Sequence, residues 1–180
     1  MPASEMTAAD VHAFLDLTDR LGVRVWLDGG WAVDACLGVQ TRPHGDLDLA
    51  IQQTDLPAVL AALHAEGYEP VPRDDATPWN FVLGDPAGHL IDFHVIVLDE
   101  DGHGVYGPPE NGERYPADAL TGKGRIGGRE VACVSPEWLV RFHTGYAVDA
   151  DDWADVSALC ERFGLAVPED YRHFQSSRAD

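Results

Sequence analysis

The fold of this 180-residue chain is decided by two short stretches, Asp28-Gly29-Gly30-Trp31 and Arg42-Pro43-His44-Gly45-Asp46-Leu47-Asp48. A mostly apolar run, Val23–Leu27, precedes the glycines, so the pattern predicts a strand that ends at Gly29-Gly30 and a helix that begins near Trp31. Adjacent glycines let backbone N–H groups approach an anion, and a helix N-terminus adds unpaired donors and a favourable dipole. The alternative for such a turn is a simple tight connection between strand and helix.

The second stretch leads into a strand pattern that carries two acids. Acids and apolar residues alternate from Asp46, so a strand would place Asp46 and Asp48 on one face and bury Leu47, Leu49 and Ile51 on the other. Like charges on one face repel unless a cation lies between them, and carboxylate oxygens suit Mg²⁺. We therefore predict a metal site at the two aspartates, with a solvated acidic face as the alternative.

A third acid interrupts the strongest strand pattern of the chain, Leu90–Leu98. Asp92 and His94 fall on the same face of this predicted strand. A carboxylate inside such a run needs hydrogen bonds or a cation, because burial of an unpaired charge is unfavourable. We expect Asp92 to face the same metal cluster as Asp46 and Asp48 from an adjacent strand. The alternative is an edge strand with one solvated face.

Taken together and in order, these motifs resemble the small antibiotic nucleotidyltransferases. The similarity is greatest to the short lincosamide nucleotidyltransferases, and the aminoglycoside 2″-adenylyltransferases resemble the chain more distantly. The resemblance spans roughly residues 20 to 170 and rests on Trp26–Asp34, Gln40–His44, Asp46–Asp48, Ile91–His94 and Phe142–Tyr146. It implies an α/β (α+β) chain with the polymerase-β-like nucleotidyltransferase fold, in which helices flank a mixed sheet.

The resemblance also implies a reaction and its cofactors. In this family a hydroxyl of a drug attacks the α-phosphorus of ATP or another nucleoside triphosphate, AMP is transferred and pyrophosphate leaves. Asp46, Asp48 and Asp92 would be the catalytic acids and would bind Mg²⁺, with two ions expected. The sequence leaves open whether Asp92 acts as base, ligand or both.

Nucleotide contacts are expected near the glycine turn. The resemblance implies that Gly29 and Gly30 hold the phosphates, and Trp31 is a further nucleotide-binding candidate at the start of the helix. Arg42 and His44 flank the acidic pair closely in sequence, so contacts with the leaving phosphates are expected from them, from Arg42 through a forked geometry. The alternatives are a salt bridge for Arg42, for example to Asp34, and a turn-stabilising imidazole for His44.

The expected acceptor is a lincosamide. As the resemblance suggests, relatives that act on aminoglycosides carry an acid two places after the third aspartate, where this chain has His94. An imidazole suits a hydroxyl or amide better than a polycationic sugar. His143 and Tyr146 lie three apart on a predicted helix and are further acceptor or nucleotide candidates, with a packed aromatic face as the alternative. An aminoglycoside, an RNA or a protein remains an alternative acceptor.

Composition narrows the partners. The net charge is −19, and the 12 Lys and Arg residues are scattered, which argues against nucleic acid because a polyanion needs a basic patch. No apolar run reaches membrane-spanning length, and the N-terminus lacks signal-peptide features, so we expect a cytoplasmic protein without a membrane partner. Nothing in the sequence fixes an oligomeric state.

The chain is expected to form one body with two parts. A nucleotidyltransferase core would cover residues 1–134, and a helical segment would cover residues 135–180, pack on the core and end in a disordered tail from Gln175. The Gly- and Pro-rich residues 99–116 predict a solvated loop with two packing tyrosines, Tyr106 and Tyr115. The alternative is a surface excursion near the mouth of the pocket, in which the rings of both tyrosines contact the acceptor.

Overall fold

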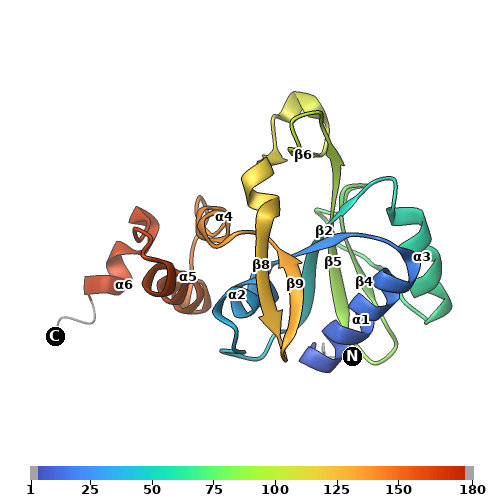
Figure 1. The fold of residues 1–180 in the computed structure, drawn as a ribbon, viewed down its shortest axis with the longest axis horizontal. Coiled ribbons are helices and arrows are strands. Elements are labelled where there is room, and N and C mark those ends of the chain that lie inside the picture. The colour runs from blue at the N-terminus through green and yellow to red at the C-terminus, as the bar shows by residue number, and fades with distance from the viewer. Residues whose placement is uncertain (1–3, 177–180) are drawn as a thin grey trace.

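The computed structural model describes residues 4–176, in which a mixed sheet is flanked by helices (Figure 1). The strands are β1 (Val25–Asp28), β2 (Asp46–Gln52), β3 (Glu69–Val71), β4 (Asn80–Gly84), β5 (Leu90–Leu98), β6 (Gly104–Tyr106), β7 (Arg114–Tyr115), β8 (Gly122–Ile126) and β9 (Arg129–Cys133). The α-helices are α1 (Ala8–Leu21), α2 (Gly29–Leu37), α3 (Leu56–Ala65), α4 (Pro136–Phe142), α5 (Ala150–Phe163) and α6 (Arg172–Ser176). The predicted fold class is confirmed.

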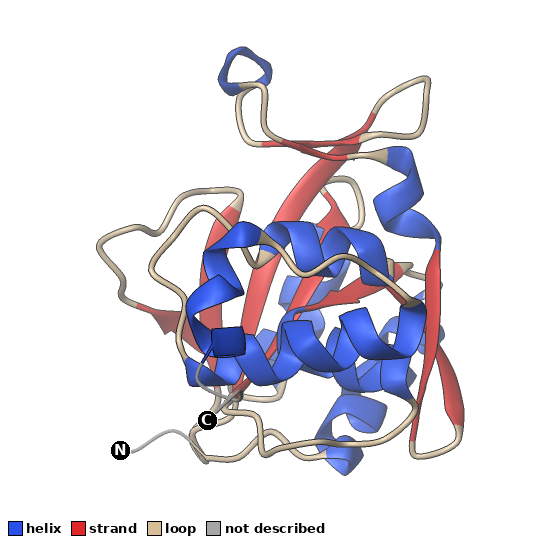
Figure 2. Cartoon of the chain, turned by 90° about the vertical axis from the view of Figure 1, so that its left-hand side faces the viewer, coloured by secondary structure: helices blue, strands red, loops and turns tan. Residues whose placement is uncertain are grey.

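The sheet has the order β3-β4-β5-β2-β1-β9-β8, and β6 and β7 form an arm on the far end of β5. At its centre, β2 runs antiparallel to β1 and parallel to β5. Figure 1 shows the arm above the sheet and the C-terminal helices α5 and α6 at the opposite side from α3. Seen from the side of those helices, they lie in front of the sheet (Figure 2).

One face of the central strands is packed with hydrocarbon. Leu47, Leu49 and Ile51 are each 0% exposed, as the alternating pattern predicted. Leu49 pairs in register with Phe93 of β5, and the Phe93 ring meets Phe14 of α1 edge to face. Successive strand residues alternate between faces, so Asp48 and Asp92 point away from α1. The acids therefore stand on the opposite face of a rigid, buried sheet.

Side chains of the preceding residues cap the starts of two long helices. Thr7 caps α1 in a reciprocal capping box with Asp10, and Asp149 caps α5 in the same way with Asp152. The acids near Asp149 are thus helix caps, as helix N-terminal charge complementarity predicts. Helix α2 begins at Gly29, two residues before the predicted start at Trp31.

The end of α4 differs from the prediction. This helix stops at Phe142, and Gly145 follows with a φ of +86° that only glycine adopts without strain. His143 and Tyr146 therefore lie in the link between α4 and α5 and do not share a helical face. Arg172–Ser176 form α6, and residues 177–180 of the predicted disordered tail lie outside the described residues.

Within residues 4–176, no helix has both the length and the apolar character needed to cross a membrane. The division into a core over residues 1–134 and a helical segment after it stays a prediction.

The hydrocarbon face should dominate stability. Leu49→Ala removes a side chain that is 0% exposed, and we expect a loss of about 3 kcal/mol, or roughly 6–12 °C in Tm. The matched control is Leu21→Ala, because Leu21 is 41% exposed at the end of α1. Thermal unfolding followed by circular dichroism measures both variants. Equal losses would show that the central sheet does not hold the fold.

Candidate active site

Three aspartates form one row across three neighbouring strands. Asp48 of β2 pairs in register with Asp28 of β1 on one side and with Asp92 of β5 on the other. Residues in one row of a sheet point to the same face, so their carboxylates converge. The sequence predicted the approach of Asp48 and Asp92 but not the role of Asp28. Its only local signal was an acid at the last position of a strand, directly before two glycines.

The glycine pair makes room for the protein's own side chains. Gly29 has a φ of +57°, and a Cβ there would collide with the Asp48 carboxylate. A Cβ on Gly30 would collide with the His44 imidazole. These glycines open α2, so the N-terminal turn of a helix lies against the acid row. The N–H of Gly29 donates to Asp28 Oδ1 at 2.8 Å, and the next N–H groups of this turn have no intrahelical acceptor.

Trp31 offers only its backbone to that turn. Its side chain is 1% exposed, its Nε1 donates to the Met6 carbonyl at 3.2 Å, and its ring contacts His44. The indole is therefore part of the core, and any contact between Trp31 and a nucleotide has to come from the main-chain N–H.

Arg42 and His44 are both engaged in ion pairs. Arg42 forms a fork with Asp155 of α5, with Nη2 2.8 Å from Oδ2 and Nε 3.3 Å from Oδ1. The partner Asp155 is 2% exposed, so it needs a cation. Asp34, suggested as the partner of Arg42, instead binds Nε2 of the buried His44 and the Thr41 hydroxyl. Phosphate contact by Arg42 and His44 stays a prediction.

The acids of the site differ in their electrostatics. Burial, followed by the charges of Asp46 and Asp28, raises the pKa of Asp48 to about 8. Burial and the charge of Asp92 raise the pKa of Asp46. Burial alone would raise the pKa of Asp28 too, but hydrogen bonds from His94, Tyr115 and Gly29 lower it. Asp28 is thus stabilised as a carboxylate, whereas Asp48 is not.

A cation would fit between the less stabilised acids. Asp48, Asp92 and His94 each offer one ligand atom, and these atoms lie within 4.8 Å of one another. Asp92 Oδ1 is buried without a hydrogen-bond partner among residues 4–176. Asp46, two residues before Asp48 on the same strand, is not a member of this group. The structure therefore brings together two of the three predicted metal acids and adds an imidazole.

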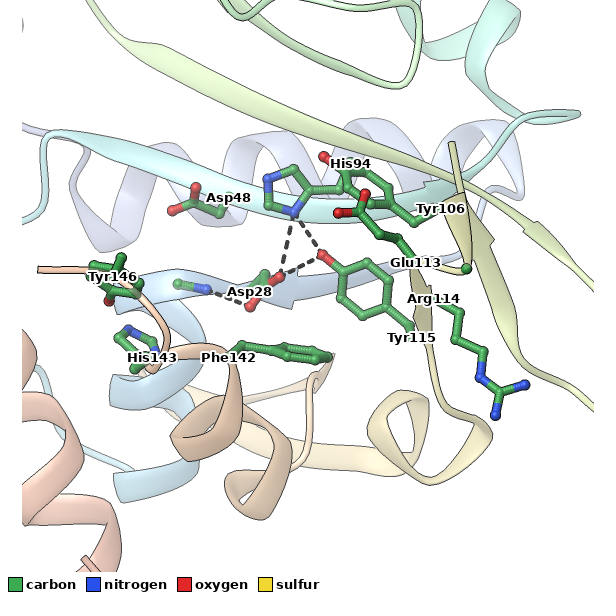
Figure 3. A pocket seen from close by; sticks show the side chains of 12 residues that line it. Asp28, Asp48, His94, Tyr106, Glu113, Arg114, Tyr115, Phe142, His143 and Tyr146 are labelled. Carbon is green, nitrogen blue, oxygen red and sulfur yellow. Dashed lines mark hydrogen bonds and ion pairs between the residues drawn. The ribbon is translucent and has the colours of Figure 1, made fainter. Parts of the chain in front are cut away.

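Tyr115 ties His94 to the acid row (Figure 3). Its hydroxyl donates to Asp28 Oδ2 at 2.8 Å, and His94 Nδ1 lies 2.7 Å from the same hydroxyl. That hydroxyl has one proton, so the imidazole is the donor to it. Burial alone would lower the pKa of His94, but Asp28, Asp48 and Asp92 raise it to about 8. The expectation that Tyr115 packs on a solvated loop is wrong, because β7 carries it into the site, 7% exposed; Tyr106 and Tyr115 line the pocket, as the alternative expected.

A cavity of about 560 Å³ opens beside this network. Its walls come from the β6–β7 arm and from the link between α4 and α5, so His143 and Tyr146 both line it as predicted pocket residues. His143 Nδ1 lies 2.7 Å from the Leu139 carbonyl, and the Tyr146 hydroxyl donates to Asp152 at 2.9 Å. The lining residues that sequence reasoning did not propose for the site are Asp28, Gly112, Glu113, Arg114 and Phe142.

Known proteins resemble the chain over most of its length. The sequence profile of the aminoglycoside-2''-adenylyltransferase family matches residues 10–159. A lincosamide resistance protein of Staphylococcus haemolyticus is 29% identical over 159 residues, which cover 88% of this chain and 98% of that protein. A 2''-aminoglycoside nucleotidyltransferase of Escherichia coli is 28% identical over 148 residues, or 79% of this chain and 77% of that protein.

Solved structures agree with these matches. The crystal structure of the lincosamide antibiotic adenylyltransferase LnuA with lincomycin has a TM-score of 0.75 and 29% identity, and covers 87% of this chain and 98% of LnuA. ANT(2")-Ia with adenylyl-2"-tobramycin has a TM-score of 0.69 and 21% identity, covers 87% and 89%, and shows the fold alone. Because the family profile extends over most of the residues that form the sheet and the site, this chain is a nucleotidyltransferase of the aminoglycoside-2''-adenylyltransferase family.

Proposed function

We propose that this protein transfers AMP from ATP to a hydroxyl of a lincosamide antibiotic and releases pyrophosphate. The observation that carries the proposal is the row of Asp28, Asp48 and Asp92 against the N-terminus of α2, in which Asp28 and Asp48 line a cavity. A helix N-terminus suits phosphate, and adjacent acids suit the cations that accompany phosphate. The two features together support an anion site beside a cation site.

The acids would hold Mg²⁺ ions, with two expected. Asp48 and Asp92 offer oxygens to one position, and Asp46 precedes Asp48 on the same face of β2. Two observations support a cation here: Asp92 Oδ1 has no hydrogen-bond partner among residues 4–176, and the pKa of Asp48 is raised, and a positive charge would offset both. When bound, Mg²⁺ neutralises charge on the phosphates and on the attacking and leaving oxygens.

The protein's own groups would position the reactants and move one proton. The N–H groups of Gly30 and Trp31 would bind the phosphates, with Arg42 and His44 nearby. A bond forms between the acceptor oxygen and the α-phosphorus, and the bond from that phosphorus to pyrophosphate breaks. The proton of the acceptor hydroxyl passes to Asp92, whose Oδ1 has no hydrogen-bond partner among the described residues.

Two observations support a lincosamide as the acceptor. The match to the Staphylococcus haemolyticus protein covers 98% of that relative, against 77% for the Escherichia coli aminoglycoside enzyme. His94 lines the cavity at the position where, as the resemblance suggests, relatives that act on aminoglycosides carry an acid. An imidazole offers no carboxylate to the ammonium groups of a polycationic sugar.

An aminoglycoside is the second candidate, and the acids of the cavity favour it. Glu113 of the arm lines the cavity together with Asp28 and Asp48, and the whole chain has a net charge of −19. Carboxylates attract ammonium groups, and a strongly acidic surface attracts cationic molecules. The scattered basic residues give no comparable support to an RNA acceptor.

Removal of either proposed catalytic acid should abolish transfer. Asp92→Asn keeps the shape of the side chain but removes the proton acceptor, and Asp46→Asn removes one cation ligand. We expect kcat to fall by about 10²-fold or more in each variant. Pyrophosphate release in the presence of ATP, Mg²⁺ and lincomycin measures the rate. Asp16→Asn, in an exposed acid of α1, is the control and should leave the rate unchanged. Transfer that persists in Asp92→Asn would refute the assignment.

The acceptor can be identified in one competition. The protein is incubated with ATP, Mg²⁺ and equal amounts of lincomycin and kanamycin, and the products are resolved by mass spectrometry. We expect adenylated lincomycin to dominate, and His94→Glu to move the ratio toward kanamycin, because a carboxylate pairs with ammonium groups. Adenylated kanamycin alone from the unaltered protein would select the second candidate.

The Asp48 carboxylate should lower the free energy of unfolding at neutral and alkaline pH. Its pKa rises from 3.8 to about 8 on folding, so the unfolded chain releases this proton first and stability falls between about pH 4 and pH 8. In EDTA, Asp48→Asn should therefore raise Tm at pH 8 by about 2 °C or more and have less effect near pH 4. Differential scanning fluorimetry compares the two proteins at each pH. A lower Tm for the variant at pH 8 would contradict the prediction that burial and neighbouring acids make the ionised Asp48 unfavourable.

A further inference from the structure

We propose that Arg73 is a positioning residue, which holds Oδ2 of Asp92 and thereby leaves Oδ1 as the oxygen that acts in the site. The proposal rests on the proposed function of Asp92. Arg73 lies two residues after β3, in the loop that leads to β4. Because β4 lies between β3 and β5 in the sheet, the side chain comes to Asp92 from outside the acid row.

The contacts divide the two Asp92 oxygens. Arg73 Nη1 donates to Asp92 Oδ2 at 3.0 Å. Oδ1 is buried without a hydrogen-bond partner among residues 4–176 and lies 3.7 Å from His94 Nε2. A carboxylate that is gripped through one oxygen cannot rotate freely, so the other oxygen keeps its direction toward His94. Reaction geometry depends on such directions, and small misplacements cost large factors in rate.

The guanidinium is itself anchored. Arg73 Nε and Nη2 donate to Asp75 Oδ1 and Oδ2 at 3.0 and 2.8 Å, so a fork on one acid fixes the plane of the group that holds the other. Asp75 is exposed and lies outside the row. A lysine could pair with Asp92 or with Asp75, but it has no rigid fork to hold both. The local sequence Pro72-Arg73-Asp74-Asp75 predicted only a polar loop.

The charge of Arg73 also acts on the cation site. Its Nη1 lies 3.0 Å from Asp92 Oδ2, so a positive charge stands directly beside one of the proposed cation ligands. A cation that binds near Asp46 and Asp92 is therefore repelled by Arg73. Arg73 therefore has two opposite effects: it should increase turnover because it orients Asp92, and it should weaken cation binding because it is positively charged. A residue that only supports the loop would not change turnover and cation affinity in opposite directions.

The test separates these two consequences. In Arg73→Gln, we expect kcat to fall by about tenfold or more, with KM for ATP within about twofold. Mn²⁺ binding to the nucleotide-free protein, measured by electron paramagnetic resonance, should become about threefold tighter because a nearby positive charge is gone. An unchanged kcat would overturn the proposal, and so would a joint loss of kcat and of Mn²⁺ affinity.

Two further variants complete the experiment. Arg73→Lys keeps the charge without the fork, so Mn²⁺ affinity should match the unaltered protein while kcat lies between those of the unaltered protein and Arg73→Gln. Arg129→Gln breaks an ion pair of similar type with Asp16 and Asp19, far from β5, and should change neither quantity. If the unaltered protein transfers no AMP, the proposed function fails, whereas the Mn²⁺ comparison still tests the effect of Arg73.

Discussion

The site depends on one constraint: strand pairing brings several carboxylates into one row of the sheet, where they repel one another. Asp28, Asp48 and Asp92 have to share one face because β1, β2 and β5 pair through consecutive backbone hydrogen bonds. A hydrocarbon layer on the other face fixes that register, since a slip by one residue would turn the acids into the core. The hydrogen bonds and charges around each carboxylate differ, so the pKa of Asp28 is lowered while that of Asp48 is raised.

Two acids of the same type, side by side, therefore have separate roles. Asp28 accepts hydrogen bonds from the Gly29 N–H and the Tyr115 hydroxyl, so it is a satisfied structural carboxylate that also holds the imidazole network. Asp48 lies against Gly29, which has no side chain, and burial followed by the charges of neighbouring acids raises its pKa to about 8. Glycine is needed at position 29 for two independent reasons, a left-handed φ and the nearness of Asp48. The same turn thus serves the helix N-terminus and the acid row.

The family resemblance was enough to predict the fold class, and local patterns were enough to predict the face of each acid. Alternation put Asp46 and Asp48 on one face of a strand, and Asp92 was expected on a neighbouring strand. The partners of Arg42, Arg73 and Tyr115 could not be predicted, because each lies on an element whose neighbours are set by tertiary packing. Arg42 meets Asp155, 113 positions away, and Tyr115 meets Asp28, 87 positions away. The charge of a side chain indicates that it needs a partner, but the tertiary arrangement of strands and helices decides which residue that partner is.

The fork between Arg42 and Asp155 has a mechanical consequence. It connects the loop before β2 to α5, and Asp155 is almost fully shielded from water. Loss of the pair between Arg42 and Asp155 would leave a buried charge without its partner, at a cost of about 3–5 kcal/mol. The link between α4 and α5, which forms part of the cavity wall, is tied to the same end of the chain: the Gly145 N–H donates to Asp170 Oδ2 at 3.0 Å, and the Tyr146 hydroxyl donates to Asp152 Oδ1 at 2.9 Å. The C-terminal part of the chain therefore anchors both the loop that leads into the acid row and one wall of the cavity beside it.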